Sequence, residues 1–256
     1  MLTTDTIQQI YKHGSVRKYR SDPVPVEVIE TLIAAGQRGS TSSNLQTYSV
    51  VVVREESRRA KMASLCADQD FVRQAPVFLA WCADLSRLDR ICRARGRILV
   101  SKYVENFLVA AMDATIAMQT TALAAESLGL GICFVGSIRN HPLDVVELLR
   151  LPPLVFPVAG MAVGWPVDPP GVRPRLPTRT VLHWECYDPE EEAGALAEYD
   201  QAMIATGIYK GRQVPVPGMD DQVEEYGWQE HSSRRVSSPV RTNLRQEINQ
   251  QGFDLS

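Results

Sequence analysis

The strongest constraint on the fold is one long apolar segment, residues 100 to 128. Its apolar side chains repeat at helical spacing, which predicts a single long core helix. The other side of this helix is also poor in charge, because the only charged residues in the segment are Lys102, Glu105, Asp113 and Glu126. A helix that is apolar nearly all round must be buried on several sides. It is therefore either the central helix of a monomer or a helix shared between a sheet and a second subunit.

Short apolar runs before and after this helix predict buried strands. They are rich in β-branched and aromatic residues, as strands covered on both faces are, and they span residues 48 to 53, 77 to 82, 132 to 136 and 158 to 165. Residues 26 to 38 have helical spacing and are followed by Gly39, a plausible stop. Helices that alternate with strands predict an α+β sandwich.

The chain changes character near its end, which predicts a division into two parts. We expect a core over residues 1 to 187 and a C-terminal excursion over residues 188 to 256. The excursion contains a helix at about 193 to 207 and a loop-like stretch from 210 to 221, KGRQVPVPGMDD. It shows no repeat that would mark a separate domain.

Composition excludes several classes of function. The chain has 256 residues, 45% of them hydrophobic, and a net charge of -3, so it lacks the basic field that binds nucleic acid or an anionic membrane. It shows no signal-peptide pattern and no stretch of about eighteen uncharged apolar residues, which predicts a cytoplasmic protein. Its five cysteines and four histidines are scattered, so no metal site is expected.

Glycine motifs give little support to nucleotide binding or hydrolysis. Gly129-Leu130-Gly131 lies after the long helix and before a strand, whereas a dinucleotide fingerprint needs the opposite order. It is therefore interpreted as a helix stop. The sequence contains neither a GxxxxGK[ST] loop nor a GxSxG elbow.

Polar clusters at three places suit an anionic ligand. His13, Ser15 and Arg17 offer an imidazole, a hydroxyl and a cation within five residues. Arg173 and Arg175 flank a proline, and residues 40 to 44 form a Ser/Thr/Asn run. Each cluster also has a plain structural alternative: a capped turn with a solvated arginine, cations that face water, or an ordinary polar loop.

The joint pattern of these clusters resembles the oxygen-insensitive NADPH nitroreductases and NADPH-flavin oxidoreductases, within the FMN-dependent nitroreductase superfamily. The resemblance rests on His-x-Ser-x-Arg at 13 to 17, the Ser/Thr run followed by Leu45-Gln46, and Gln69 before VRQAPVFLAWCAD. It rests also on AAESLGLG at 124 to 131 and GWPVDPPGVRPRLP at 164 to 177, with matching order and spacing over roughly residues 5 to 205.

The resemblance implies a fold and an activity. The implied fold is a three-layer sandwich with a mainly antiparallel central sheet flanked by helices, assembled as an intertwined homodimer. FMN is implied at each of two interface sites. The implied enzyme takes hydride from NADPH and reduces nitroaromatics, quinones or free flavins by a ping-pong two-electron mechanism. FMN carries this chemistry, so no catalytic side chain is required.

The resemblance also implies roles for individual residues. The segment of His13, Gly14, Ser15, Val16 and Arg17 would hold the FMN phosphate and ribityl chain, together with Arg173 and Arg175. Thr41, Ser42, Ser43 and Gln69 would reach the flavin, and the backbone of Phe134, Val135, Gly136 and Ser137 would approach its ring. Lys210 and Arg212 would meet the 2′-phosphate of NADPH, or else form a solvated basic patch. Glu105 would lie near the substrate pocket, or else be a surface charge.

The sequence departs from the family pattern at two positions, and two other functions are compatible with it. Gly14 stands where family members carry arginine, and Ser137 stands where they carry a second glycine. One alternative is a dedicated flavin reductase that supplies reduced FMN to a partner oxygenase, or a reductase of disulfides or chromate. Another is a non-catalytic flavin-binding protein.

Overall fold

The computed structural model describes residues 2–100, 103–216 and 219–255. Contacts within the chain divide it into two units. We call Met1–Gly171 with Arg241–Ser256 the core unit, and Val172–Val240 the excursion unit. The sequence-based division at residues 187 and 188 stays a prediction.

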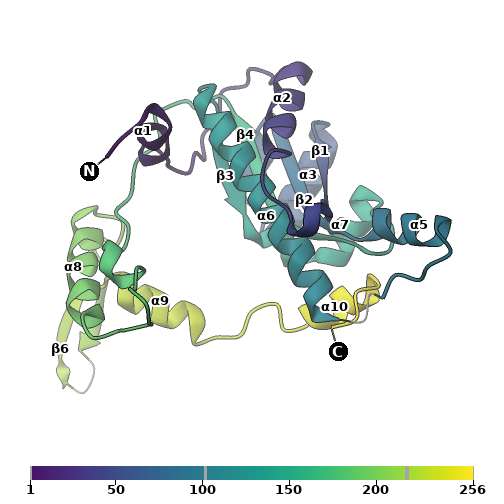
Figure 1. Cartoon of the computed structure of the whole chain (residues 1–256). Coiled ribbons are helices and arrows are strands. Elements are labelled where there is room, and N and C mark those ends of the chain that lie inside the picture. The colour runs from purple at the N-terminus through teal and green to yellow at the C-terminus, as the bar shows by residue number, and fades with distance from the viewer. Residues whose placement is uncertain (1, 101–102, 217–218, 256) are drawn as a thin grey trace. The chain divides into compact units, whose positions relative to one another are not determined.

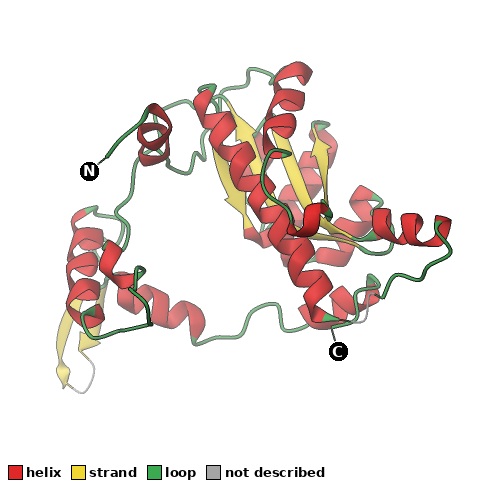
Figure 2. Ribbon diagram, in the orientation of Figure 1, coloured by secondary structure: helices red, strands yellow, loops and turns green. Residues whose placement is uncertain are grey.

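The core unit contains most of the secondary structure (Figures 1 and 2). Its elements are α1 (Asp5–Tyr11), α2 (Val26–Gly36), η1 (Ser42–Asn44), β1 (Tyr48–Val53), α3 (Glu56–Leu65), α4 (Asp70–Gln74), β2 (Val77–Asp84), α5 (Ser86–Ala94), α6 (Val104–Ser127), β3 (Gly131–Val135), η2 (Gly136–Arg139), α7 (Pro142–Leu149), β4 (Val155–Gly164) and α10 (Leu244–Gln250). The excursion unit contains η3 (Thr178–Thr180), α8 (Glu192–Ala205), β5 (Gln213–Val216), β6 (Met219–Glu225) and α9 (Trp228–Val236).

The four strands of the core unit form one sheet in the order β1-β2-β4-β3. All three neighbouring pairs are antiparallel. On β2, Leu79 lies opposite Val52 of β1 and Met161 of β4. The predicted α+β class with a mainly antiparallel sheet is therefore confirmed.

Helices cover both faces of this sheet, which makes three layers. Residues of β2 alternate between the faces: Leu79 and Trp81 pack in one cluster with α2, α6 and α10, and Phe78 and Ala80 pack in another with α3, α4 and α7. Every residue of β2 is buried. Because both faces are covered, β2 is a continuous apolar run rather than an alternating one.

Helix α6 lies across one face of the sheet beside α2 (Figure 1). Its buried side consists largely of alanines, which let the helix approach the sheet and α2 closely. Its length and hydropathy also suit a membrane span, but this buried side packs in the core cluster with the sheet. The predicted helix began at residue 100, four residues before α6, and residues 101 and 102 lie outside the described residues.

The end of α6 confirms the predicted glycine stop. Gly129 has a φ of 81°, and its N–H donates to the Glu126 carbonyl while the Leu130 N–H donates to the Ala125 carbonyl. This pair of bonds is the Schellman arrangement, in which a left-handed glycine satisfies the last carbonyls of a helix.

Close packing inside the sheet predicts that Gly160→Ala destabilises the core unit. A Cβ at Gly160 would lie 2.3 Å from Cζ of Phe78, a ring that is fully buried. We expect a loss of about 1–3 kcal/mol, the usual cost of overpacking, measured from the urea midpoint. Gly171→Ala is the control, because nothing lies within 4 Å of its added Cβ. An equal midpoint for both variants would contradict the packing argument.

The excursion unit has a small aromatic cluster of its own, and it contains a hairpin where a loop was predicted. Tyr199, Met203 and Tyr209 are buried together with partly buried Leu176, Tyr226 and Trp228. The stretch from 210 to 221 was predicted as a loop, but β5 and β6 pair there as an antiparallel hairpin. The prediction was wrong because Pro215 reads as a strand breaker, whereas a two-stranded ribbon has only edge strands, which tolerate proline.

Candidate functional site

Residues 15 to 20 form an extended segment bonded to β3 and to the end of β4. The Val16 N–H donates to the Ile132 carbonyl at 2.9 Å, and the Arg20 N–H donates to the Trp165 carbonyl at 2.8 Å. The Val16 side chain is buried, whereas Ser15 and Arg17 are exposed. Side chains two residues apart in an extended chain point the same way. The hydroxyl of Ser15 and the guanidinium of Arg17 therefore share one outward face.

The buried Tyr19 side chain bonds this segment to the core. Its hydroxyl donates to the Val16 carbonyl at 2.8 Å and lies 3.4 Å from the Ala162 carbonyl. Burial raises the pKa of Tyr19 well above its ordinary value, so the hydroxyl stays a neutral donor. The segment that carries Ser15 and Arg17 is thus anchored to the core rather than a mobile loop.

His13 and Gly14 precede this segment and are also constrained. Nδ1 of His13 lies 2.6 Å from Oε1 of Glu126 in the last turn of α6. A Cβ at Gly14 would lie 2.6 Å from the Gly171 carbonyl oxygen. Glycine is therefore required here by the close approach of the backbone at Gly171, and the family's arginine would need that backbone to move.

The end of β3 lies beside Ser15 and Arg17. Burial raises the pKa of the Cys133 thiol, while the charge of Arg17 and a hydrogen bond from Ser15 act in the opposite direction. Beyond it, Phe134 is 36% exposed and Val135 is buried. An added Cβ at Gly136 would meet no atom closer than 3.5 Å. That atom is Nη2 of the Arg139 side chain, and Gly136 itself is exposed.

Gln69 belongs to a neighbouring turn that also contacts this region. It caps α4 after two residues of positive φ, Ala67 at 62° and Asp68 at 50°. The Ser137 hydroxyl donates to the Cys66 carbonyl at 3.0 Å, and the Arg17 guanidinium lies 5.9 Å from the centre of the Phe71 ring. The predicted segments 13–17 and 134–137 therefore meet in one region with the turn that contains Gln69.

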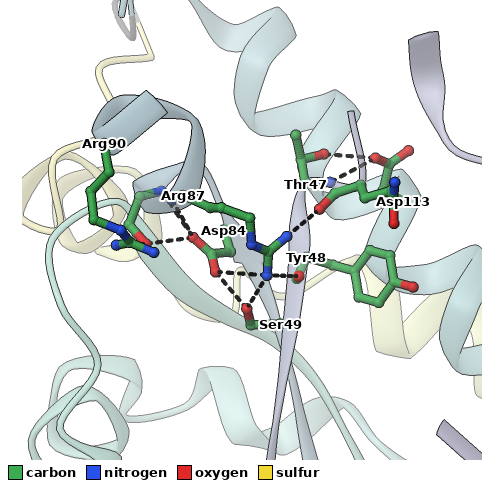
Figure 3. A network of polar contacts seen from close by, with 9 residues as sticks. Thr47, Tyr48, Ser49, Asp84, Arg87, Arg90 and Asp113 are labelled. Carbon is green, nitrogen blue, oxygen red and sulfur yellow. Dashed lines mark hydrogen bonds and ion pairs between the residues drawn. The ribbon is translucent and has the colours of Figure 1, made fainter. Parts of the chain in front are cut away.

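A separate set of contacts binds Ser42 and Thr47, and Figure 3 shows Thr47 beside Asp113. The buried Asp113 carboxylate of α6 accepts hydrogen bonds from the Ser42 N–H at 2.9 Å, the Thr47 N–H at 3.0 Å and the Thr47 hydroxyl at 2.8 Å. Arg87 of α5 donates to the Gln46 carbonyl at 2.8 Å and to the Tyr48 carbonyl at 3.3 Å. The segment is thus bonded to two helices.

This segment needs such anchoring because its backbone is strained. Ser43, Asn44 and Gln46 have φ values of 49°, 57° and 53°, and a left-handed conformation costs about 1–2 kcal/mol for a residue with a side chain. Sequence reasoning did not assign a role to Asp113 or Arg87. The one available signal was a carboxylate in the middle of an apolar helix.

Asp84 supports Arg87 and gives stability a pH dependence. It accepts hydrogen bonds from the Ser49 and Ser86 hydroxyls. Burial acts to raise the pKa of Asp84, but these hydrogen bonds and the charge of Arg87 outweigh it and hold the pKa below its ordinary value of 3.8. A carboxyl with a lowered folded-state pKa stabilises the protein above its ordinary pKa, and this stability is lost as pH falls through the folded-state value.

We therefore expect Asp84→Asn to destabilise the core unit by about 1–3 kcal/mol at neutral pH. The difference from wild type should begin to shrink as pH falls below the ordinary value of 3.8 and should continue to shrink until the pH passes the lower folded-state pKa, where folded Asp84 becomes protonated. Urea unfolding at pH 7 and at pH 3 measures both values. Asp22→Asn removes an exposed carboxylate paired with Arg20 and is the control. A destabilisation that is the same at both pH values would refute the assignment.

The predicted cations of the excursion unit surround its aromatic cluster. The guanidinium groups of Arg212 and Arg234 lie 5.6 Å and 5.7 Å from the centre of the Tyr226 ring. Lys210 is exposed in the turn before β5. Arg173 acts electrostatically on Tyr209, whose ring centre lies 5.4 Å from that of Tyr226. This unit therefore gathers several cations around two tyrosine rings.

Arg175 and Glu105 are the remaining predicted site residues. Nη1 of Arg175 donates to the carbonyls of Arg173 and Pro174, both at 3.2 Å. That Arg17 and Arg175 meet at one anion stays a prediction. Glu105 is exposed in the first turn of α6, where a carboxylate is also stabilised by the helix dipole.

Fold and site together define an α+β sandwich with a polar strand edge suited to an anionic, planar ligand. The chain belongs to the nitroreductase family: the family model matches residues 10–165, and the model of its C-terminal domain matches residues 173–256. The FMN reductase (NADPH) of Bacillus subtilis is 32% identical over 255 residues, which is 98% of each chain. The oxygen-insensitive NADPH nitroreductase of Salmonella typhimurium is 33% identical over 248 residues, 97% of this chain and 98% of that one. The solved structure of NfrA2 from B. megaterium has a TM-score of 0.90 at 33% identity and covers 99% of this chain and 100% of its own.

Proposed function

We propose that this chain is an FMN-dependent oxidoreductase that takes hydride from NADPH and passes two electrons to nitroaromatics, quinones or free flavins. One observation carries the proposal. Ser15 and Arg17 face outward from an anchored segment beside the exposed Gly136, in a chain whose full-length relatives are named FMN reductase (NADPH) and oxygen-insensitive NADPH nitroreductase.

The residues at this edge fit FMN in type and placement. Arg17 and Ser15 supply a cation and a hydroxyl for the phosphate, as charge-assisted recognition requires. The contact with Glu126 fixes the position of the His13 ring two residues before Ser15. The absence of a side chain at Gly136 admits a flat ring against the backbone. FMN supplies the redox chemistry when bound, so the protein's task is to bind, orient and shield it.

Preference for NADPH is assigned to the cations of the excursion unit. The 2′-phosphate would be bound by Arg212 and by Lys210, which is two residues earlier in the sequence. Arg234 lies at the same tyrosine ring as Arg212 and would assist. A guanidinium held over an aromatic ring is pre-organised for phosphate, and so loses less entropy on binding.

A homodimer completes the proposal. The exposed side of α6 carries Val104, Leu108, Met112 and Ile116 at four-residue spacing, with exposures of 56%, 50%, 52% and 39%. We call these four residues the α6 stripe. Contiguous exposed apolar surface on one helix marks an interface, and a second copy of the same helix would cover it.

The net charge of -3 favours neither nucleic acid nor an anionic membrane as a partner, and we propose a cytoplasmic location.

The test of this function is the flavin absorption of the purified protein and its response to NADPH. We expect purified protein to be yellow, and NADPH added without air to bleach the flavin band much faster than NADH does. Arg212→Gln should reduce the preference for NADPH, whereas Arg235→Gln is the control on the same unit. Colourless protein that neither binds added FMN nor oxidises NADPH would overturn the proposal.

A further inference from the structure

We propose that Asp113 and Arg87 are positioning residues that hold residues 41 to 47 in the shape that contacts the flavin. We call residues 41 to 47 the clamped segment, and its last residue, Thr47, is labelled beside Asp113 in Figure 3. This inference rests on the proposed function, because it takes Thr41, Ser42 and Ser43 as flavin contacts. It adds two residues that touch neither the flavin nor the acceptor and act through the backbone.

The two side chains recognise opposite groups of the clamped segment. The Asp113 carboxylate accepts from N–H groups at both ends of it, Ser42 and Thr47. The Arg87 guanidinium donates to the carbonyl of Gln46. An anion that binds N–H groups and a cation that binds a carbonyl cannot exchange places. The pair therefore specifies one backbone conformation and does not merely attach the segment to the core.

The burial of Asp113 argues that this arrangement is more than a surface contact. The residue is 1% exposed in a helix that is otherwise nearly apolar on its buried side. A buried carboxylate is unfavourable unless hydrogen bonds replace its water. Here the replacement comes from the clamped segment, through two N–H groups and the Thr47 hydroxyl. The carboxylate and the segment therefore stabilise each other.

The clamped segment has a strained backbone between its bonded ends. Its three left-handed residues, Ser43, Asn44 and Gln46, lie between the two points that Asp113 binds. If either point is released, the residues between them can relax to ordinary backbone angles. Ser42 and Ser43 then lose their placement even though the sheet and α6 remain folded.

Helix α5 offers a matched pair for testing the role of Arg87. Arg87 and Arg90 are both exposed and carry the same charge one turn apart. Arg87 bonds to the Gln46 and Tyr48 carbonyls, whereas Arg90 bonds to the Ser86 hydroxyl. Arg87→Gln and Arg90→Gln therefore remove equal charge, but only the first removes a bond to the clamped segment. Arg87→Gln also removes contacts with Ser49 and Asp84, so the melting temperature of both variants is measured beside FMN affinity.

The experiment measures FMN affinity by flavin fluorescence, and hydrogen exchange of the Ser42 and Thr47 amides in the FMN-free protein. For Asp113→Asn we expect FMN binding weakened about tenfold or more, since bonds to a charged acceptor are lost, together with faster exchange of both amides. For Arg87→Gln we expect a weaker effect in the same direction. With FMN at saturation, kcat of both variants should return toward wild type, because the chemistry itself is unchanged.

Two controls separate positioning from general stability. Arg90→Gln should leave FMN affinity unchanged. Gln251→Met removes a buried amide that donates to the Pro152 carbonyl at 2.7 Å, so it should lower the melting temperature without weakening FMN binding. If Asp113→Asn does not fold, the difference in FMN affinity between Arg87→Gln and Arg90→Gln still tests whether the clamped segment is held for FMN binding.

The outcomes distinguish this inference from the proposed function. Wild-type protein that does not bind FMN contradicts the proposed function. Wild-type protein that binds FMN, with unchanged affinity in both Asp113→Asn and Arg87→Gln, overturns the positioning role alone. Equal weakening by Arg87→Gln and Arg90→Gln also overturns it, because charge and not the clamped segment would then be responsible.

Discussion

Replacing Arg17 and Arg175 together by alanine is expected to abolish FMN retention through purification. Each guanidinium is proposed to bind the flavin phosphate, and a hydrogen bond to a charged group contributes about 1.5–3 kcal/mol. Loss of both would weaken binding by about two to four orders of magnitude. The ratio of flavin absorbance to protein absorbance in the purified variant measures the effect, and titration with FMN gives its size.

Arg20→Ala is the matched control for this experiment. Arg20 lies on the same extended segment as Arg17, but its guanidinium stacks on Trp165 and pairs with Asp22. These contacts engage the Arg20 guanidinium with residues other than those of the proposed phosphate site. Its removal should leave flavin content unchanged. Full flavin content in the Arg17 and Arg175 double variant would show that the phosphate site lies elsewhere.

Aspartate at both Leu108 and Met112 is expected to convert the protein to a monomer. These residues are 50% and 52% exposed in the centre of the α6 stripe. Burying two carboxylates without partners in an apolar interface costs several kcal/mol for each, so the dimer should be weakened by more than about a thousandfold. Analytical ultracentrifugation measures the mass, and flavin content of the monomer shows whether the interface completes the cofactor site.

Val52→Asp tests whether any exposed apolar residue would behave in this way. Val52 is 40% exposed on β1, comparable to Ile116 of the α6 stripe at 39%. An aspartate there should leave the mass of the assembly unchanged. If the Leu108 and Met112 variant keeps the mass of wild type, or if wild type is itself a monomer, the proposed interface is wrong.

Local periodicity was sufficient to predict the main elements of the core. The strand predicted at 48 to 53 has the same bounds in β1, and the helix predicted at 26 to 38 ends at Gly36, two residues early. The stop at Gly129 was predicted from one residue type, because a left-handed position favours glycine. Each of these features depends on neighbours within a few residues.

The candidate site was predictable only in part. The resemblance to the nitroreductases named Ser15, Arg17, Gln69 and the 134 to 137 segment. The contacts that draw these segments together, such as Ser137 with the Cys66 carbonyl, join residues far apart in sequence. The requirement for glycine at position 14 likewise comes from the backbone at Gly171.

The sequence by itself determined the four core strands, the helix that begins at residue 26 and the long apolar helix, because hydrophobic periodicity acts along the chain; the three layers were implied by the resemblance to the nitroreductases. Only the tertiary structure decided why Asp113 stands in that helix. Its carboxylate has no partner among its near neighbours in sequence, and the N–H groups that satisfy it belong to Ser42 and Thr47, which are 71 and 66 residues away. A buried charge is tolerated only where hydrogen bonds replace water, and folding alone brings those donors to it.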